Sequence, residues 1–137
     1  MKNKAGVIVY TKDPEGNYRF LLRHNKPFKG REDEWTILFG TVEENETYME
    51  CVRRELKEEY GIKDIKRVED LEYVIKVDDL DIHFYAVEVK DINTTICLNE
   101  ESIGYDWMLI EDVKNIMKYP DEKRVFDILI ENLTLIK

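Results

Sequence analysis

Hydrophobic and polar positions divide the chain into short segments that have the period of a strand or of a helix. Residues 5–11 and 18–23 are rich in apolar and β-branched side chains, and both predict strands. Residues 13–17, Asp-Pro-Glu-Gly-Asn, form a strong turn signal between them, so a hairpin is expected. The polar segment 25–33 predicts a loop, and residues 35–38 predict a short buried strand.

The clearest helical period covers residues 46–60. The stripe expected to face the core comprises Met49, Val52 and Leu56. Asn45 is the expected N-cap, because its side chain can accept a hydrogen bond from the first turn. Gly61 is expected to follow the helix in the left-handed conformation that ends many helices.

The second half of the chain predicts further strands and then helices. Strands are expected at 71–77, 82–89 and 105–109, with a turn at 78–79 between the first two. A short helix at 111–118 is expected to stop before Pro120, and Asp121 is expected to cap a last helix. This order predicts one domain over residues 1–137, in which helices cover a mixed sheet as an α/β or α+β sandwich.

Composition and charge narrow the class of protein. A length of 137 residues with 43% hydrophobic content suits one domain with its own core. No apolar run approaches the roughly 20 residues of a membrane span, and we expect no signal peptide. Two cysteines without metal-ligand spacing favour reduced thiols and a cytoplasmic location. The net charge of −9 argues against bulk nucleic-acid binding, although a divalent cation could bridge the protein to a small anionic ligand.

Three carboxylates lie close together on the helix at 46–60. Glu55 is followed by Glu58 and Glu59, at the spacings where like charges destabilise a helix by about 0.2–0.5 kcal/mol per pair. A hard divalent cation would remove this repulsion, since Mg²⁺ prefers oxygen ligands. Such a cation neutralises phosphate charge and activates water, and a neighbouring carboxylate can accept the proton of that water.

The carboxylates belong to a longer pattern. It reads Gly40, five residues, Glu46, seven residues, then Arg54-Glu55-apolar-any-Glu58-Glu59-any-Gly61-apolar. At typical residue frequencies, the seven fixed positions recur by chance on the order of once in ten million windows or fewer. The pattern is that of the Nudix box, and the chain resembles the Nudix hydrolase superfamily over nearly its full length.

The resemblance implies an α/β/α sandwich with a mixed sheet, and hydrolysis of a phosphoanhydride bond with Mg²⁺, for which Mn²⁺ can substitute. By this resemblance Glu55, Glu58, Glu59 and the carbonyl of Gly40, presented by the loop before the helix, would be metal ligands. Arg54 would orient the carboxylates, while Glu46 and Gly61 would have structural roles. The carboxylate that deprotonates water differs among members of the superfamily, and we expect Glu58 to be the most sensitive one.

The second half resembles diadenosine tetraphosphate hydrolases in particular. Those enzymes have Glu-His six and five residues before a Trp that matches Trp107; here Glu101 matches the Glu, and Ser102 replaces the His. Glu101 is therefore a candidate metal ligand or base. Phe84 falls where that group has an aromatic residue that stacks on a base, and Lys90 where it has a phosphate-facing lysine.

Several positions keep two interpretations open. Phe84 either stacks on a base or belongs to the core, and strand alternation allows only one of Phe84 and Tyr85 to face the cleft. Arg23 and the basic residues after it are either solvated loop charges or guides for phosphates. In the loop before the helix, the superfamily usually has Trp, two residues, Pro, Gly or Lys, and Gly. The proline is absent between Trp35 and Gly40, and Phe39 replaces the lysine, which removes a phosphate contact.

The leading functional hypothesis is hydrolysis of a nucleoside diphosphate linked to another group, with dinucleoside polyphosphates as the first class of substrate. The alternatives are a housecleaning nucleoside triphosphate pyrophosphohydrolase and a Nudix fold that only binds a nucleotide. The complete motif argues against the last of these, because binding alone does not require every carboxylate. The expected partner is a small nucleotide, with no membrane and no bulk nucleic acid, and the protein is expected to be a monomer or a homodimer.

Overall fold

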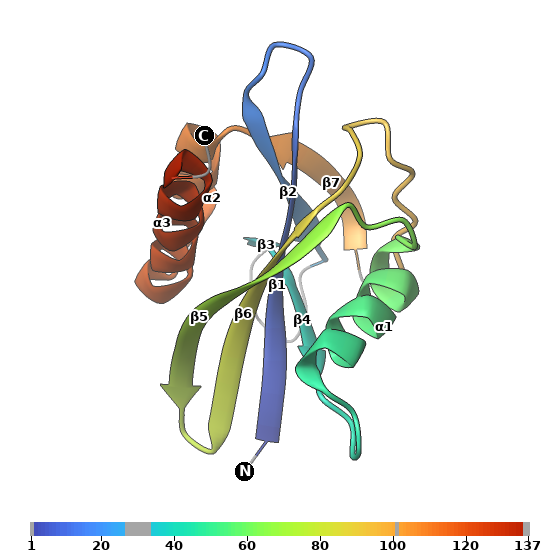
Figure 1. Ribbon diagram of the computed structural model, residues 1–137, viewed down its shortest axis with the longest axis vertical. Coiled ribbons are helices and arrows are strands. Elements are labelled where there is room, and N and C mark those ends of the chain that lie inside the picture. The colour runs from blue at the N-terminus through green and yellow to red at the C-terminus, as the bar shows by residue number, and fades with distance from the viewer. Residues whose placement is uncertain (1, 27–33, 101, 136–137) are drawn as a thin grey trace.

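A mixed β-sheet separates two layers of helices (Figure 1). The computed structural model describes residues 2–26, 34–100 and 102–135. Its elements are, in chain order, β1 (Lys2–Lys12), β2 (Tyr18–Asn25), β3 (Glu34–Thr36), β4 (Leu38–Thr41), α1 (Tyr48–Tyr60), β5 (Arg67–Val77), β6 (Leu80–Glu88), β7 (Ser102–Met108), α2 (Ile110–Ile116) and α3 (Pro120–Leu135).

Strand β1 is the centre of the sheet. It runs parallel to β6 and antiparallel to β2 and β4. The main strand order is β3-β2-β1-β6-β5, and β7 pairs with β2. Side chains of β1 from Ala5 to Tyr10 alternate between two cores, except at Gly6, and are buried on both faces, as expected for a strand with a parallel neighbour and helices on either side.

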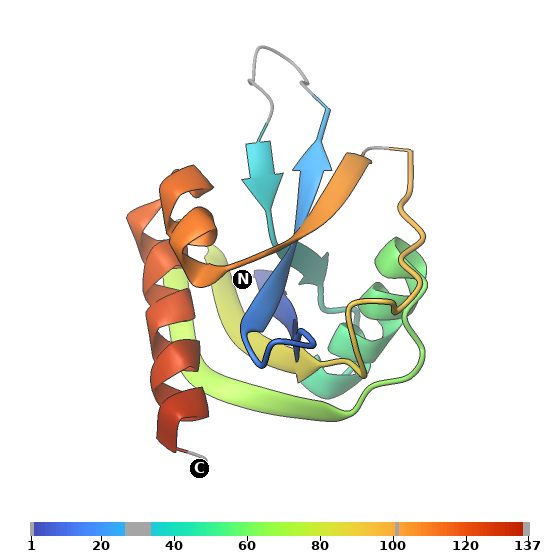
Figure 2. The same ribbon diagram turned by 90° about the horizontal axis from the view of Figure 1, so that it is seen from above.

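Each face of the sheet has its own hydrophobic core. Helix α1 covers one face, where Leu21, Leu38 and Leu56 are buried together. Helices α2 and α3 cover the other face (Figure 2). There Phe20 and Phe126 pack edge to face. The predicted α/β/α sandwich with a mixed sheet is therefore confirmed. Among the described helices, none is long and apolar enough to span a membrane.

The start of α1 differs from the prediction. The N-cap is Thr47, whose hydroxyl accepts from the backbone N–H of Glu50, while the Glu50 carboxylate accepts from the backbone N–H of Thr47. This capping box satisfies two donors at once, which one side chain at Asn45 would not do. Asn45 lies instead in the preceding turn with a φ of 64°. The prediction for Gly61 is confirmed, since its φ is 69° and its N–H donates to the carbonyl of Lys57.

The buried side of α1 also differs from the expected stripe. It comprises Cys51, Val52, Glu55, Leu56 and Tyr60. Met49 was assigned to the core, but it lies in the first turn of the helix and 40% of its surface is exposed. Glu55, by contrast, is buried, so the core-facing side of α1 contains one of the motif carboxylates.

Two other element boundaries differ from the prediction, because they depend on contacts between distant segments. The strand predicted at 35–38 is divided at Ile37, because β3 pairs with β2 whereas β4 pairs with β1. Pro120 was expected only to stop α2, but it is the first residue of α3, where its missing N–H would have no helical partner. Asp121 consequently lies inside the first turn of α3 and is not its cap.

Candidate active site

Arg54 is the centre of a polar network that joins α1 to β4 and to the loop between them. Its guanidinium binds Glu46 through two hydrogen bonds, Nε to Oε2 at 2.7 Å and Nη2 to Oε1 at 2.9 Å. Nη1 donates to Glu55 at 2.9 Å and to Glu58 at 3.2 Å, and Nη2 donates to the carbonyl of Thr41 at 2.9 Å. A planar guanidinium suits this fork geometry. The hydrogen bonds from Arg54 lower the pKa of Glu46 to about 2.

Glu55 and Gly40 touch each other across the gap between α1 and β4. A Cβ atom placed on Gly40 would lie 2.2 Å from Cγ of Glu55, so only glycine permits this approach. The Glu55 side chain is 11% exposed, and burial raises the pKa of its carboxyl. The sequence predicts that Gly40 lies on the loop before the helix, but it belongs to strand β4. A regular strand therefore presents its backbone to Glu55.

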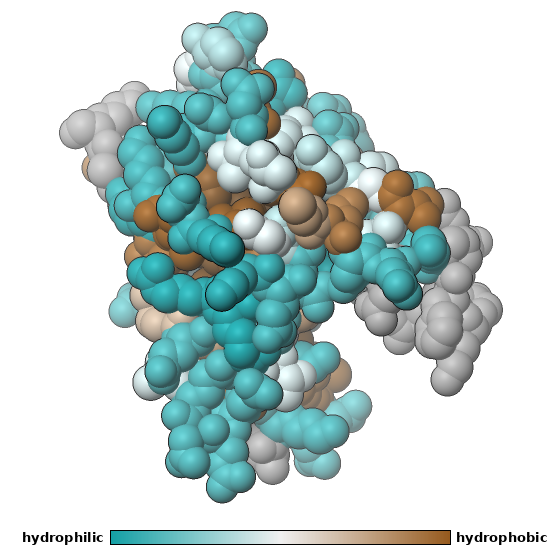
Figure 3. All heavy atoms as spheres, turned by 90° about the vertical axis from the view of Figure 1, so that its right-hand side faces the viewer, coloured by the Kyte–Doolittle hydropathy of each residue, from teal (hydrophilic) through white to brown (hydrophobic). Residues whose placement is uncertain are grey.

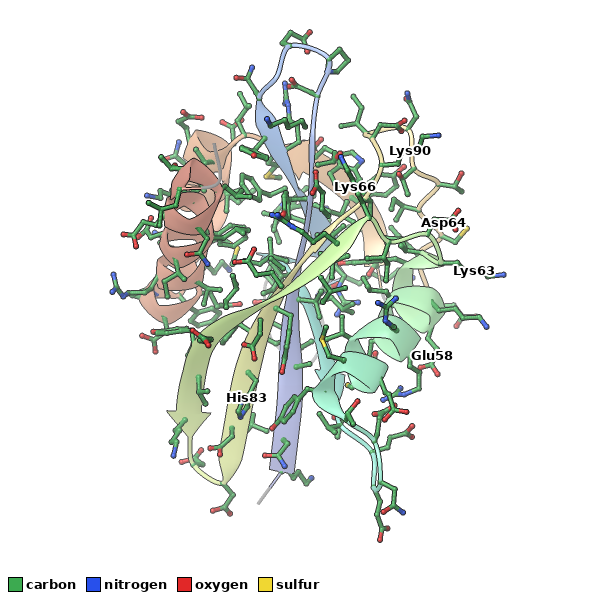
Figure 4. The ribbon with its side chains drawn as sticks, viewed as in Figure 1. Glu58, Lys63, Asp64, Lys66, His83 and Lys90 are labelled. Carbon is green, nitrogen blue, oxygen red and sulfur yellow. The ribbon has the colours of Figure 1, made fainter. Side chains whose placement is uncertain are left out.

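The other two motif carboxylates differ in environment. The Glu58 side chain is 57% exposed, and Figure 4 shows it on the side of α1 that points away from the sheet. The face of the molecule on this side is mainly hydrophilic, with apolar patches between the polar side chains (Figure 3). The Glu59 side chain is 26% exposed; its Oε2 lies 3.4 Å from Nη1 of Arg23 and accepts a hydrogen bond from the amide of Asn99.

The carboxylates present donor atoms that suit a hard cation. Their oxygens and the glycine at the point of closest approach fit Mg²⁺, which commonly takes a few carboxylates together with water and ligand phosphates. In the part of the chain that the structure describes, however, no three His, Cys, Asp or Glu side chains converge as a ready-made metal cage. Arg54 holds Glu55 and Glu58 on one side, while Arg23 and Asn99 hold Glu59 on the other.

A cleft of about 560 Å³ opens on the α3 side of the sheet. Its apolar residues come from segments far apart in the sequence, namely β3, β4, β5, β6 and the connection between α2 and α3, while β1, β2 and α3 contribute polar ones. Strand β4 joins the cleft to the carboxylates: Phe39 lines the cleft, and the next residue, Gly40, faces Glu55. The network on α1 and the cleft are therefore adjacent across one strand.

Phe84 and Phe39 pack together in the wall of this cleft. Their ring centroids are 6.2 Å apart in an edge-to-face arrangement, and the surface of Phe84 is 0% exposed. Gly6 makes room for Phe84, because a Cβ at that position would lie 2.6 Å from the ring. Phe84 and Tyr85 face opposite cores, as strand alternation predicted. The phenylalanine that replaces the expected lysine is thus part of the apolar wall.

One end of the cleft carries acidic side chains, among them Glu34 and Glu122. Burial and, to a smaller extent, the negative charge of Glu34 together raise the pKa of Glu122 to about 7. A carboxyl with this pKa is half protonated near neutral pH, so Glu122 can donate a hydrogen bond as well as accept one. Nothing in the local sequence around Glu122 indicates this property, since it depends on the fold that covers it.

One predicted site residue is not brought to the carboxylates, and another cannot be placed. Lys90 is exposed on the connection after β6, apart from Glu58 (Figure 4), and it does not line the cleft. Glu101 lies outside the described residues. Conversely, Arg23 and Asn99 contact Glu59 although neither was singled out for this role. Arg23 shares a face of β2 with buried Leu21, and this alternation is the signal that could have identified it as inward-facing.

The NUDIX domain family model matches residues 2–129 of this chain. The asymmetrical bis(5'-nucleosyl)-tetraphosphatase of Mus musculus is 30% identical over 95 residues, which are 65% of this chain and 65% of that protein. An Ap4A hydrolase of C. elegans, solved as a binary complex, superposes with a TM-score of 0.77 at 19% identity and covers 98% of both chains.

The NUDIX domain of Shewanella oneidensis NrtR, solved with ADP ribose, superposes with a TM-score of 0.76 at 14% identity, over 96% of this chain and 87% of that one. At such identities the two solved structures support the fold alone. The family match extends over almost the whole chain, and it includes both the α1 network and the strands around the cleft. The chain therefore belongs to the NUDIX domain family.

Proposed function

We propose that the protein is a metal-dependent hydrolase that cleaves a phosphoanhydride bond in a nucleoside diphosphate-linked substrate, with dinucleoside polyphosphates as the leading class. The proposal rests on one observation: the Arg54 network and the close approach of Gly40 to Glu55 lie directly across β4 from an apolar cleft. Carboxylates arranged for a cation thereby adjoin a space suited to a nucleoside. The similarity to the Mus musculus tetraphosphatase supports the same class of substrate.

Each carboxylate has a distinct role in this proposal. Glu55, Glu58, Glu59 and the carbonyl of Gly40 would hold Mg²⁺ or Mn²⁺, which neutralises phosphate charge and lowers the pKa of the attacking water when bound. Arg54 fixes the orientation of Glu55 and Glu58 from one side. Glu58 contacts Arg54 through Oε2, so Oε1 is the atom proposed to accept the proton. Glu46 fixes Arg54 itself.

The cleft would hold the nucleoside between aromatic walls. In this arrangement Phe39 supplies apolar contact area with Phe84 packed behind it, and Glu122 offers a hydrogen bond to a polar edge of the base. The side chains that β5 and β6 contribute to the cleft are all apolar, so a bound base would displace water from them. A loose transition state for phosphoryl transfer needs positioning and electrostatic stabilisation more than covalent chemistry, and this arrangement provides both.

A substrate panel tests the proposal. We expect diadenosine tetraphosphate to be cleaved with a higher kcat/KM than ATP or dGTP in the presence of Mg²⁺. The opposite preference would favour a nucleoside triphosphate pyrophosphohydrolase, an alternative supported by Phe39 in the position of the expected lysine. Tight binding of these nucleotides without turnover would leave a binding module as the remaining function.

A further inference from the structure

Arg23 connects the cleft to the carboxylates of α1. It lies on β2, where it lines the cleft, and its Nη1 is 3.4 Å from Oε2 of Glu59. The Arg23 side chain is only 13% exposed, so its charge is largely removed from bulk water. Arg23 thus belongs to the lining of the space proposed for the nucleotide, while its guanidinium contacts a proposed ligand of the metal.

Arg23 has a buried hydrogen-bond donor without an acceptor in the described part of the chain. Its Nε is buried without a hydrogen-bond partner among the described residues, and so is the hydroxyl of Tyr60, a residue 1% exposed. A guanidinium has five donors, and leaving a buried one without an acceptor costs free energy. An incoming phosphate oxygen would supply the missing acceptor.

Glu59, in turn, is restrained on one oxygen. Arg23 and the amide of Asn99 both contact Oε2. The positive charge of Arg23 opposes a second cation at the same carboxylate, because the two cations would repel each other at short range. While Arg23 pairs with Glu59, metal binding at Glu59 is therefore disfavoured.

We propose that Arg23 exchanges partners when the site is loaded: it pairs with Glu59 in the free enzyme and turns to a phosphate of the ligand in the cleft, which leaves Glu59 to the metal. This inference rests on the proposed function and deepens it. The exchange couples the two binding events, so a phosphate ligand strengthens metal binding and metal strengthens phosphate binding by the same factor.

Metal binding without nucleotide gives the first test. Mn²⁺ titrations followed by electron paramagnetic resonance are made on the wild type, Arg23→Gln and Lys4→Gln. Arg23→Gln should bind Mn²⁺ about two- to fivefold more tightly, the range typical of a partly exposed ion pair. Lys4 lines the same cleft without a contact to Glu59 among the described residues, so Lys4→Gln should match the wild type. Unchanged or weaker Mn²⁺ binding by Arg23→Gln overturns the exchange.

Phosphate binding without metal gives the reciprocal test. The probe is a methylene-bridged ATP analogue titrated in EDTA by calorimetry. Glu59→Gln should bind the analogue more tightly than the wild type because Arg23 is released, and this gain should vanish in the Arg23→Gln, Glu59→Gln double variant. A gain that persists in the double variant shows simple charge repulsion by Glu59 and overturns the exchange.

The two proposals fail in different ways. If the wild type binds Mn²⁺ and hydrolyses its substrate but the Arg23 variants show no coupling, only the exchange is wrong. If the wild type binds no Mn²⁺ and hydrolyses nothing in the panel, both are wrong. Melting curves of every variant, recorded beside the titrations, restrict the comparison to folded protein.

Discussion

The two sides of β4 satisfy their polar groups in different ways. On the α1 side, Arg54 binds the carboxylates around it, and its partners among the described residues lie within the segment 41–58. On the cleft side, the aromatic walls come from segments that are distant in the sequence. Among the residues that line the cleft, Glu122 has a pKa raised by burial, and the Nε of Arg23 has no hydrogen-bond partner among the described residues. Local hydrogen bonds orient the carboxylates of α1, whereas the polar groups of the cleft can still bind a ligand.

Removing the proposed proton acceptor on α1 should have the greatest effect on activity. Glu58→Gln should lower kcat by about 10²–10⁴-fold, the range for a lost acid–base group. Stability should change little, because the Glu58 side chain is 57% exposed. Glu44→Gln, an exposed loop charge outside the motif, is the control in the same activity assay. If Glu101→Gln is inactive while Glu58→Gln keeps most of its activity at saturating metal, the base lies before Trp107 and not on α1.

A change in the wall of the cleft should act on stability first. Phe84→Ala should lose about 3–5 kcal/mol of unfolding free energy in urea, since the ring is fully buried. If Phe84 also stacks on a base, KM should rise by the equivalent of about 1–3 kcal/mol. Phe126→Ala removes a buried ring that does not line the cleft, so it is the matched control. Equal KM values in the two variants would assign Phe84 to the core alone.

Between the two regions, Gly40 is the most sensitive point of contact. Gly40→Ala should cost about 1–3 kcal/mol, as overpacking typically does, because its Cβ would overlap Cγ of Glu55. The displaced carboxylate should also weaken Mn²⁺ binding. Gly104→Ala on β7 meets nothing within 4 Å and should behave as the wild type in both the unfolding and the Mn²⁺ titrations. Wild-type metal affinity in folded Gly40→Ala would contradict the proposed contact.

The smallest expected effect concerns the pH dependence of stability. The pKa of Glu122 is raised from 4.5 to about 7, so the folded state disfavours its charged form. The wild type should therefore lose stability relative to Glu122→Gln as pH rises from about 4.5 to about 7, with no further change above that range. Urea unfolding at pH 5 and pH 8 measures this difference. Glu131→Gln, an exposed position on the same helix, should show no such pH-dependent difference.

Much of the α1 side could be predicted from the sequence because its geometry is local. Helical spacing places Glu55, Glu58 and Glu59 within one turn, and the Arg54 contacts follow from the same helix and the loop before it. The errors there were also local: the Thr47 and Glu50 pair forms the cap that was assigned to Asn45. A capping box ahead of an apolar run was visible in the sequence.

The cleft could be predicted only in part, because it depends on pairing between distant strands. Alternation separated Phe84 from Tyr85 correctly. It did not reveal that Phe39 packs on Phe84, that the chain covers Glu122, or that Arg23 reaches Glu59. These contacts arise from the order of strands and from the connection between α2 and α3, which no spacing within one segment encodes.

The most direct test of the account is the metal dependence of hydrolysis. Diadenosine tetraphosphate turnover is followed in Mg²⁺, after addition of EDTA, and after Mn²⁺ is restored in excess. The oxygen donors of Glu55, Glu58 and Glu59 predict that turnover stops with the chelator and returns with either cation. Full turnover in metal-free buffer would contradict the central claim that these carboxylates act through a bound cation.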